Sequence, residues 1–469
     1  MLAATLALAA CSGGNQQAGG RHRLDLEIAD LVPLSGNEQP IGVSGKKAVE
    51  LAVAEIRKAI KAADAEHAVT VKHANYRSDS KLADDFAANF ARAGYPCLVG
   101  PWSSVTMISV GATVSAARRI ITISPAASND AIGRLEIGGY VARTIPPDRL
   151  QGEALATTIA DELGGAKGKK VSIGALKSNY GNDLTGTFAE AWQKLGGQIG
   201  ARVVYDSNLP DYKTQAQELV APKPAAYVFF DFQETYLKVA SELLKTRKWK
   251  ASRTFATDSL AVSSLGQAGG VAVEGLRGVA PGAPRLGATA LAFERLWNDA
   301  PAPKYHQPYD AQAFDATVIC YLSAVAAGST KAPRMKTQLR RVASPPGKKY
   351  TWQHLSDAIR ALEAGYDIDY VGASGSLDMA SLDLAKAGDL TAGYYDVYRY
   401  KNARLGLYGS VSVPPSGKGI QRFPIEYVTQ QVGGATPAGA KGPSGASGVS
   451  GPTGATGTTG KKEEKKKSR

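Results

Sequence analysis

The chain has 469 residues, of which 44% are hydrophobic and 21% are charged, a composition typical of a globular protein. Its length suits two α/β lobes with tails better than one compact core, and no apolar run reaches the roughly 18 residues that a membrane-spanning helix needs. The formal net charge is +13. Because no basic helix interleaved with aromatic residues is present, we expect no nucleic-acid partner.

The N-terminus is an apolar segment that ends in a cysteine. Leu8-Ala9-Ala10-Cys11 resembles the lipobox of bacterial lipoproteins, in which small residues precede a cysteine that is lipidated. We expect residues 1–20 to be a lipoprotein signal and linker, with lipidation at Cys11, whose thiol is the nucleophile that takes the lipid. No Lys or Arg precedes the apolar stretch, which departs from the usual signal. The alternative is a disordered N-terminus with a chance cysteine.

From Leu24 onward, short apolar runs alternate with amphipathic segments. The predicted strands are Leu24–Leu31, Tyr95–Gly100, Ile120–Ser124, Lys170–Leu176, Arg202–Asp206, Ala226–Phe230 and Arg253–Thr257. The predicted helices are Val43–Ala62, Leu82–Ala93, Val105–Ala117, Leu150–Leu163, Leu184–Leu195, Thr235–Lys245, Thr289–Asn298 and Ala311–Ala327. This alternation, with nearly continuous apolar strands, indicates an α/β fold of parallel sheets covered by helices on both faces. Such sheets bind ligands outside the carboxyl ends of their strands.

Proline-rich breaks mark where the chain passes from one lobe to the other. We expect one crossing at Arg143–Asp148 and a second at Val279–Pro284. The C-terminus is of low complexity, with a glycine at every third position from Gly439 to Gly460. This is the collagen period, which would imply a trimer, but few prolines fall inside the run, so we favour a flexible tail.

The chain offers few residues for metal, redox or catalytic chemistry. Its three cysteines are too few for a disulfide scaffold, so we expect Cys97 and Cys320 to be buried free thiols, with pairing as the alternative. None of the five histidines has metal-ligand spacing, and the phosphate-loop, GxGxxG and GxSxG motifs are missing. We therefore expect no metal, no cofactor and no enzymatic activity, with an enzyme on a doubly wound fold kept as a minor alternative.

Loops that follow predicted strands carry hydroxyl, amide and carboxylate groups. Ser103 and Ser104 lie at the start of a predicted helix, where free N–H groups and the helix dipole suit a carboxylate, although they could merely cap the helix. Ser128 follows the next strand. Asp258 follows another strand and could hold an ammonium group, unless it is an ordinary capping or solvated acid, as Asp231 and Glu234 are more readily expected to be.

Six fragments occur in an order and spacing that resemble a known family. They are Val32-Pro33-Leu34-Ser35-Gly36, Val99-Gly100-Pro101-Trp102-Ser103-Ser104, Ile123-Ser124-Pro125-Ala126-Ala127-Ser128, Tyr180-Gly181, Phe314-Asp315-Ala316 and Gly388-Asp389. Together they make the chain similar, from about Leu24 to Tyr400, to the type I periplasmic binding proteins of branched-chain amino-acid (leucine/isoleucine/valine) ABC transporters. The resemblance implies two doubly wound lobes joined by a three-strand hinge, here with disordered N- and C-terminal tails.

The resemblance also implies roles for individual residues. Ser104, with Ser103 beside it, matches the serine that binds the ligand's α-carboxylate, and the Ala126 carbonyl and Ser128 match positions that grip the α-carboxylate and α-ammonium. Tyr180 matches an aromatic residue of the second lobe that closes over the ligand, and Asp258 matches the acidic partner of the ammonium.

Two departures from the family pattern put leucine-type specificity in question. Gln233 stands where branched-chain binders often have an aromatic residue, and Asp258 is one methylene shorter than the glutamate of some members. A one-residue slip would put Ser259 in the place of Asp258. Trp102 and Gln233 suit a more polar or an aromatic ligand side chain.

The resemblance divides the chain between the lobes. We expect lobe 1 at residues 21–144 and 281–371, lobe 2 at 145–280 and 372–410, an extension at 411–432, and the collagen-like tail with its basic end at 433–469.

The implied function is capture of an amino acid or similar small polar solute by hinge closure. The implied partner is the membrane permease of an ABC importer, and the implied location is the periplasm or cell surface, held by a lipid anchor. The alternative is a sensor or regulator of an envelope enzyme that uses the same fold without transport.

Overall fold

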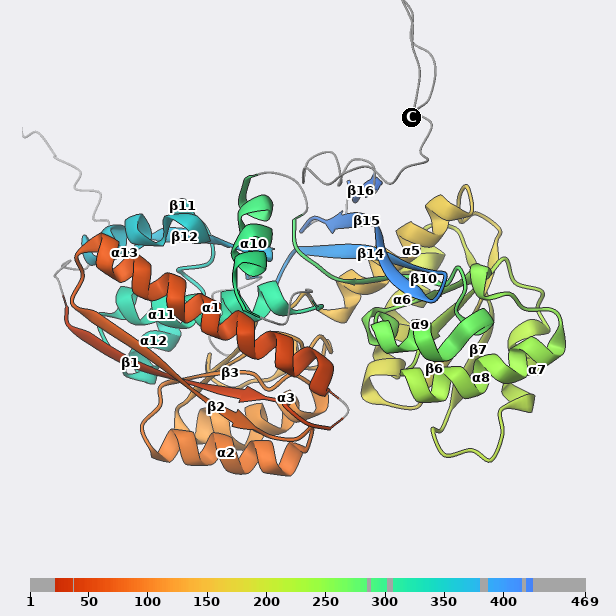
Figure 1. Ribbon diagram of the computed structural model, residues 1–469, viewed down its shortest axis with the longest axis horizontal. Coiled ribbons are helices and arrows are strands. Elements are labelled where there is room, and N and C mark those ends of the chain that lie inside the picture. Colours follow the sequence, from red (N-terminus) through yellow and green to blue (C-terminus); the bar gives the residue numbers. More distant parts are fainter. Residues whose placement is uncertain are drawn as a thin grey trace, which may run out of the picture.

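The computed structural model describes residues 22–36, 38–284, 288–301, 307–379, 387–415 and 419–424. Both predicted tails, with Cys11 and the glycine triplets, lie outside the described residues. Two α/β lobes follow one another along the long axis of the molecule, one built mainly from the chain before Arg143 and the other from the middle of the chain (Figure 1). The predicted α/β fold class with two parallel-sheet lobes is confirmed.

Lobe 1 is built on a five-stranded parallel sheet of order β2-β1-β3-β4-β5. Its strands are β1 (Leu24–Val32), β2 (His67–Asn75), β3 (Cys97–Val99), β4 (Ile121–Ser124) and β5 (Val141–Arg143). Its helices are α1 (Gln39–Ala63), α2 (Ser80–Arg92), α3 (Ser104–Val110), α4 (Ala116–Arg118), α10 (Ala288–Asp299), α11 (Asp310–Ala327), α12 (Ala332–Leu339) and α13 (Leu355–Glu363). Helices α1 and α11 lie on one side of the sheet and α2 on the other (Figure 1). A small sheet of β11 (Lys348–Thr351), β12 (Ile368–Gly372) and β13 (Gly375–Ser376) completes the lobe.

Lobe 2 is built on an eight-stranded sheet of order β16-β15-β14-β10-β9-β8-β6-β7. Its strands are β6 (Lys170–Leu176), β7 (Gln198–Tyr205), β8 (Ala226–Phe230), β9 (Thr254–Ala256), β10 (Arg277–Pro281), β14 (Gly393–Lys401), β15 (Arg404–Val413) and β16 (Gln421–Pro424). Strands β6 to β10 are parallel, and β14, β15 and β16 extend the sheet antiparallel. Its helices are α5 (Asp148–Glu162), α6 (Asn179–Lys194), α7 (Lys213–Val220), α8 (Gln233–Thr246) and α9 (Ser263–Gly269).

Burial on both faces explains why the central strands are nearly continuous apolar runs. All five residues of β8 are buried. Tyr227 and Phe229 belong to the core cluster that contains residues of α7 and α8, whereas Val228 and Phe230 belong to the cluster that contains residues of α5 and α6. Successive side chains of a strand point to opposite faces, so a strand covered on both sides needs apolar residues throughout.

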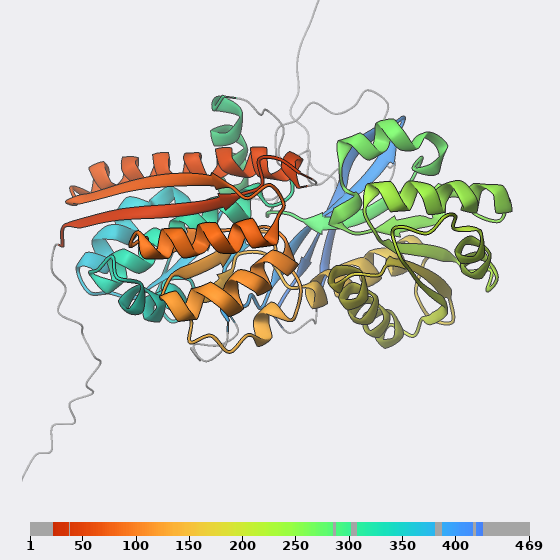
Figure 2. The same ribbon diagram turned by 90° about the horizontal axis from the view of Figure 1, so that it is seen from below.

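The chain passes between the lobes where the sequence predicts its breaks. Strand β5 of lobe 1 ends at Arg143 and helix α5 of lobe 2 begins at Asp148, while β10 of lobe 2 ends at Pro281, ahead of α10 in lobe 1. A third passage leads from β13 to β14. Seen from below, the two lobes remain separate bodies that are linked near the middle (Figure 2).

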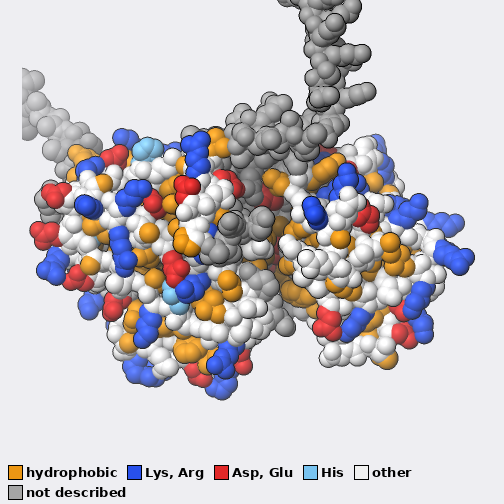
Figure 3. All heavy atoms as spheres, viewed as in Figure 1, with side chains coloured by type: hydrophobic (Ala, Val, Ile, Leu, Met, Phe, Trp, Pro, Cys, Tyr) orange, Lys and Arg blue, Asp and Glu red, His pale blue; other side chains and the backbone are white. Residues whose placement is uncertain are grey.

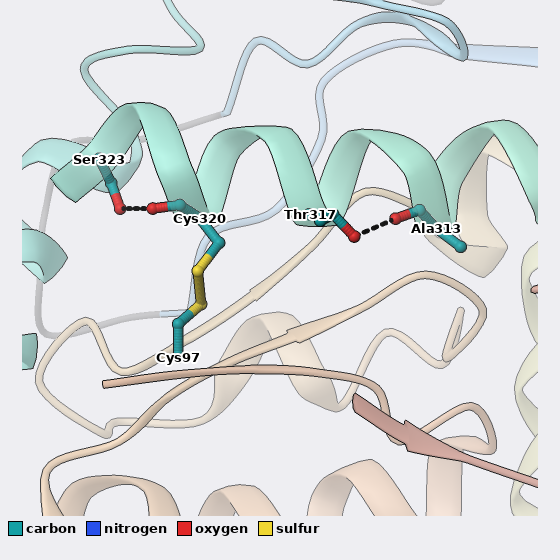
Figure 4. The surroundings of a disulfide bond; sticks show 5 residues. All are labelled: Cys97, Ala313, Thr317, Cys320 and Ser323. Atoms are coloured by element: carbon teal, nitrogen blue, oxygen red, sulfur yellow. Dashed lines mark hydrogen bonds between the residues drawn. A yellow bond between two sulfur atoms is a disulfide. The ribbon is translucent and has the colours of Figure 1, made fainter. Parts of the chain in front are cut away.

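Cys97 and Cys320 form a disulfide with a Cα–Cα distance of 6.4 Å, so the prediction of free thiols is wrong. The bond joins β3 to α11 inside lobe 1 (Figure 4). The two residues are 223 positions apart. They meet because α11 packs across β3 in the lobe 1 core, and no local sequence pattern reports that packing.

Among the described residues, no single helix is both long and apolar enough to cross a membrane. Helices α11 and α12 meet that criterion only as a pair bent by 110°, and α11 is buried in the lobe 1 core. On the face shown in Figure 3, Lys and Arg side chains are interspersed with Asp and Glu over both lobes.

Candidate ligand-binding cleft

A cavity of about 390 Å³ lies between the two lobes. Lobe 1 contributes the loops that follow β1, β2, β3 and β4 and the residues just before α11. Lobe 2 contributes the loops that follow β6, β8 and β9. The cavity is thus formed at the carboxyl ends of parallel strands of both sheets, where open α/β sheets bind ligands.

Seven of the eight binding residues expected from the sequence line this cavity. They are Trp102, Ser103, Ser104, Ala126, Ser128, Tyr180 and Asp258. Gln233 is not among the lining residues, and its side-chain oxygen accepts a hydrogen bond from Ser264 Oγ at 2.6 Å. Phe232, the residue before it, lines the cavity instead, and so does Ser259.

The other two acids considered from the sequence serve structural roles. Asp231 is buried, and its carboxylate accepts hydrogen bonds from Tyr205 Oη at 2.8 Å and from the Phe232 N–H at 2.7 Å. Burial raises the pKa of Asp231 to about 7. Glu234 is exposed and pairs with Lys238 in the next turn of α8.

Two glycines allow Trp102 its position in the cavity wall. Gly100 has φ +89°, and a Cβ there would lie 2.3 Å from the Leu31 carbonyl oxygen, so the loop that carries Trp102 needs glycine at this point. Gly45 lies inside α1, and a Cβ there would lie 1.8 Å from Trp102 Cη2. The indole ring therefore fills the space that any larger residue at position 45 would occupy, and it is only 2% exposed.

Hydroxyl groups connect the lobe 1 loops. Ser124 Oγ donates to the Pro101 carbonyl at 2.6 Å and accepts from the Ala127 N–H at 3.0 Å, which ties the loop after β3 to the loop after β4. Ser104 Oγ accepts from the Asn129 N–H at 3.2 Å. The loops that carry the predicted carboxylate site are thus held by bonds within lobe 1.

A buried tyrosine links the start of α1 to the Trp102 loop. Tyr76 is fully buried, its hydroxyl donates to Glu38, and it accepts from the Trp102 N–H at 3.2 Å. Glu38 lines the cavity. Burial raises the pKa of Glu38, because its carboxyl loses water and gains only neutral hydrogen-bond donors.

Asp258 is the centre of a hydrogen-bonded cluster on the lobe 2 side. Its Oδ1 accepts from Gln151 Nε2 at 2.5 Å and from Tyr180 Oη at 3.0 Å, and its Oδ2 accepts from Tyr309 Oη at 2.5 Å. Burial, together with the Asp258 charge, raises the pKa of Tyr180 and of Tyr309 well above the usual range. Both phenols therefore keep their protons and act as donors to the carboxylate.

Direct hydrogen bonds join the lobes beside the cavity. Tyr309 precedes α11 of lobe 1 and reaches Asp258 of lobe 2. Asn129 Nδ2 donates to the Asn179 carbonyl at 3.2 Å, and the Asp130 N–H donates to Asp183 at 2.9 Å. These bonds bring the cleft faces together, as in a closed arrangement of hinged lobes.

Asp148 is fully buried at the first crossing between the lobes, where its N–H donates to the Ser128 carbonyl at 2.9 Å. Burial raises the pKa of Asp148 well above the usual range, and the neighbouring carboxylates of Asp258 and Asp183 add to this effect. No group of three or more His, Cys, Asp or Glu residues suited to a metal ion occurs in the described part of the chain.

Sequence reasoning missed Glu38, Phe232 and Tyr309, which all line the cavity. Glu38 follows a fragment already recognised after β1, so a search for acids next to that fragment would have found it. Phe232 is adjacent to the predicted Gln233, so the residue of this loop that lines the cavity lies one position before the predicted one in the sequence. Tyr309 carries no such signal, because its role depends on where α11 lies relative to lobe 2.

Solved structures with this architecture come from several organisms. The leucine binding protein LivK of Thermotoga maritima superposes with a TM-score of 0.63 at 19% identity, covering 82% of this chain and 98% of that one. LivJ of Streptococcus pneumoniae, a branched-chain amino acid transporter substrate binding protein solved with isoleucine, gives 0.62 at 16% identity, covering 85% and 99%. A solute binding protein of an ABC transporter from R. palustris, solved with benzoate, gives 0.60 at 17% identity, covering 82% and 96%.

A curated relative is the chemotactic signal transduction system substrate-binding protein BasB of Halobacterium salinarum. It is 24% identical over 361 residues, which cover 76% of this chain and 83% of that protein. The chain thus has the solute-binding fold found in ABC-transporter binding proteins, a fold used for amino acids and for an aromatic acid among these neighbours.

The periplasmic binding protein family model matches residues 25–353, which include the lobe 1 loops that follow β1, β2, β3 and β4 and the whole parallel part of lobe 2. Members of this family bind solutes and are not enzymes, and membership implies an extracytoplasmic location. The chain belongs to the periplasmic binding protein family.

Proposed function

We propose that this protein captures an α-amino acid between its lobes and presents the closed complex to the permease of an ABC importer. One observation carries this proposal: seven residues expected from the sequence to grip a carboxylate and an ammonium line a single cavity between the lobes. Hydroxyl groups lie on the lobe 1 side and an aspartate on the lobe 2 side, so the two ends of a zwitterion would engage different lobes. That division favours closure on binding.

Individual roles follow from the chemistry of each group. Ser103 and Ser104 begin the helical stretch α3, where N–H groups and hydroxyls would take the α-carboxylate. The Ala126 carbonyl and Ser128 would complete the grip, and Asp258 with Tyr180 would take the α-ammonium. Trp102 would contact the ligand side chain, and Gln233 would act only through Phe232 beside it.

A branched-chain ligand is not the favoured member of the amino-acid class. Besides the residues above, the lining includes the hydroxyls of Ser78, Ser80 and Thr106. These hydroxyls already have partners within lobe 1. The carboxyl of Glu38 also lines the cavity, and a purely aliphatic side chain would remove water from it without giving it a partner, which costs free energy. The ligand side chain is therefore expected to be polar.

We also propose that Cys11 is lipidated, which would hold the protein at the membrane. The lobes are proposed to be divided at the domain boundaries expected from the sequence. Mass spectrometry of the mature N-terminal peptide tests the anchor: we expect a lipidated cysteine as the first residue, and an unmodified Cys11 in a longer peptide would contradict it.

A thermal-shift screen against the common amino acids, with benzoate included, tests the proposed function. A ligand that binds only the folded state stabilises it by about 2.7 kcal/mol at a hundredfold excess over its dissociation constant. At least one amino acid should raise the melting temperature. A screen in which none does, or in which benzoate alone does, would overturn the proposal.

Sensing is the second candidate function, and the similarity to a chemotactic substrate-binding protein favours it. The same capture step would then report to a membrane receptor or an envelope enzyme rather than feed a permease. Affinity purification of the tagged protein from its own membranes, with ligand present, separates the two. Recovery of permease subunits supports import, and recovery of a receptor without a permease supports sensing.

A further inference from the structure

The charges that face the cavity are all of one sign. Among its described lining residues are two carboxyl groups, Glu38 from lobe 1 and Asp258 from lobe 2, and no Lys, Arg or His. An aromatic or aliphatic acid without an ammonium group would bring a third negative charge into this space. Like charges at close range in a partly desolvated site repel, so such a ligand is disfavoured.

The two carboxyl groups lie in different surroundings. Asp258 accepts three hydrogen bonds, from Gln151, Tyr180 and Tyr309. Glu38 accepts from the Tyr76 hydroxyl and is also hydrogen-bonded to the Ser103 side chain, and no ion pair to Glu38 is found within the described residues. A partly buried carboxyl with neutral donors and no cation is poorly compensated until a cation arrives. The raised pKa of Glu38, caused by burial, agrees with this.

Aromatic rings from both lobes add a second attraction for a cation. Trp102 and Tyr309 on the lobe 1 side pack edge to face with their centroids 6.4 Å apart. Tyr180 and Phe232 on the lobe 2 side lie with their centroids 5.6 Å apart. All four line the cavity. Ring faces attract ammonium and guanidinium groups, and more strongly where water is excluded.

We propose that the ligand is an α-amino acid with a cationic side chain, whose second positive charge is held by Glu38 among the aromatic rings. This inference rests on the proposed function, because Asp258 and the serines must first take the α-ammonium and the α-carboxylate. It goes further by assigning the specificity to Glu38. The cavity volume of about 390 Å³ lies within the range of small-molecule sites.

A matched pair of ligands tests the inference in the wild-type protein. L-Lysine and L-norleucine share their chain length and α-groups, but only lysine carries the terminal ammonium. Isothermal titration should show lysine, or its guanidinium counterpart L-arginine, binding about 10- to 100-fold more tightly than norleucine, as expected for a charge-assisted hydrogen bond. Equal affinity for lysine and norleucine, with arginine no tighter, would overturn it.

A matched pair of variants locates the charge. Glu38→Gln keeps the shape and the contact with Tyr76 but removes the charge, so it should remove the preference for the cationic ligand over norleucine. Glu66→Gln removes a charge at an exposed position outside the cavity, so it should keep the wild-type preference. A Glu38→Gln variant that keeps the preference would contradict the assignment to Glu38.

The outcomes distinguish this inference from the proposed function. If neutral amino acids bind and cationic ones do not, the charge inference fails and the capture of amino acids stands. If no amino acid of either kind binds, the proposed function fails and the inference fails with it.

Discussion

At the scale of single residues, the cleft depends on positions that are small or buried rather than on the polar groups alone. Gly45 leaves room for the Trp102 ring, and Tyr76 holds both the Trp102 loop and Glu38. Neither residue is a ligand contact by itself. Each sets the position of a residue that we propose to contact the ligand, so their substitution should affect binding through geometry.

Gly45→Ala should displace the Trp102 indole, because the added Cβ would overlap the rigid ring. We expect at least a tenfold loss of affinity for the bound amino acid, about 1.4 kcal/mol, measured by calorimetry. Gly186→Ala is the control, because Gly186 also lies inside a helix but has nothing within 4 Å of an added Cβ. It should keep full affinity and gain about 0.5–1 kcal/mol of stability. Equal affinity in both variants would mean that Trp102 does not need this space.

Asp148→Asn should change how stability depends on pH. The folded-state pKa of Asp148 is raised by burial, so ionisation disfavours the folded state, and wild-type stability falls as pH rises above the pKa of an unfolded aspartate, about 3.9. Asparagine cannot ionise, so the variant does not lose this stability as the pH rises. The melting temperature of the variant relative to wild type should therefore increase between pH 4 and pH 8. A difference that stays constant over this range would show that Asp148 keeps an ordinary pKa.

At the scale of elements, most strands and helices that are buried along one stripe or on both faces could be predicted from sequence. The buried strands β5 and β10 are exceptions, because they are short and overlap the proline-rich breaks that were predicted as crossings between lobes. Strand β2 was missed because it is the edge strand of the lobe 1 sheet and its residues are mostly half-buried or exposed, with Lys72 and two histidines among them. The β14–β15 hairpin was missed because its alternating tyrosines and charged residues give no apolar run. Short helices α7 and α13 were also missed.

The cavity-lining residues on loops after predicted strands could be found from sequence, because parallel sheets bring the carboxyl ends of their strands to one edge. Tyr309 and the Cys97–Cys320 bond could not, because both depend on how α11 packs against elements far away in the chain. The position of α11 is thus the main structural fact that the sequence does not report.

The disulfide should stabilise lobe 1, because the crosslink reduces the conformational entropy of the unfolded chain. The Cys97→Ala/Cys320→Ala variant should lose about 2–5 kcal/mol of unfolding free energy, measured by urea denaturation. A reductant should lower the denaturation midpoint of the wild type and leave that of the variant unchanged, which separates loss of the bond from loss of packing. A wild-type midpoint that is insensitive to reductant under denaturing conditions would show that the bond is absent in solution.

At the scale of the whole molecule, two lobes meet through a few hydrogen bonds around a cavity, and the chain passes between them three times. Tyr309 is placed to couple the start of α11 in lobe 1 to Asp258 in lobe 2. A ligand ammonium at Asp258 would join this same cluster, so binding and closure would reinforce each other.

The measurement that tests this account most directly is calorimetric titration of the bound amino acid into the wild type and into Asp258→Ala. Removal of the carboxylate takes away the proposed partner of the α-ammonium and the acceptor for Tyr309, so the account predicts that binding falls below detection while the variant remains folded by circular dichroism. Unchanged affinity in the folded variant would contradict it, because the solute would then be held somewhere other than between Asp258 and the lobe 1 serines.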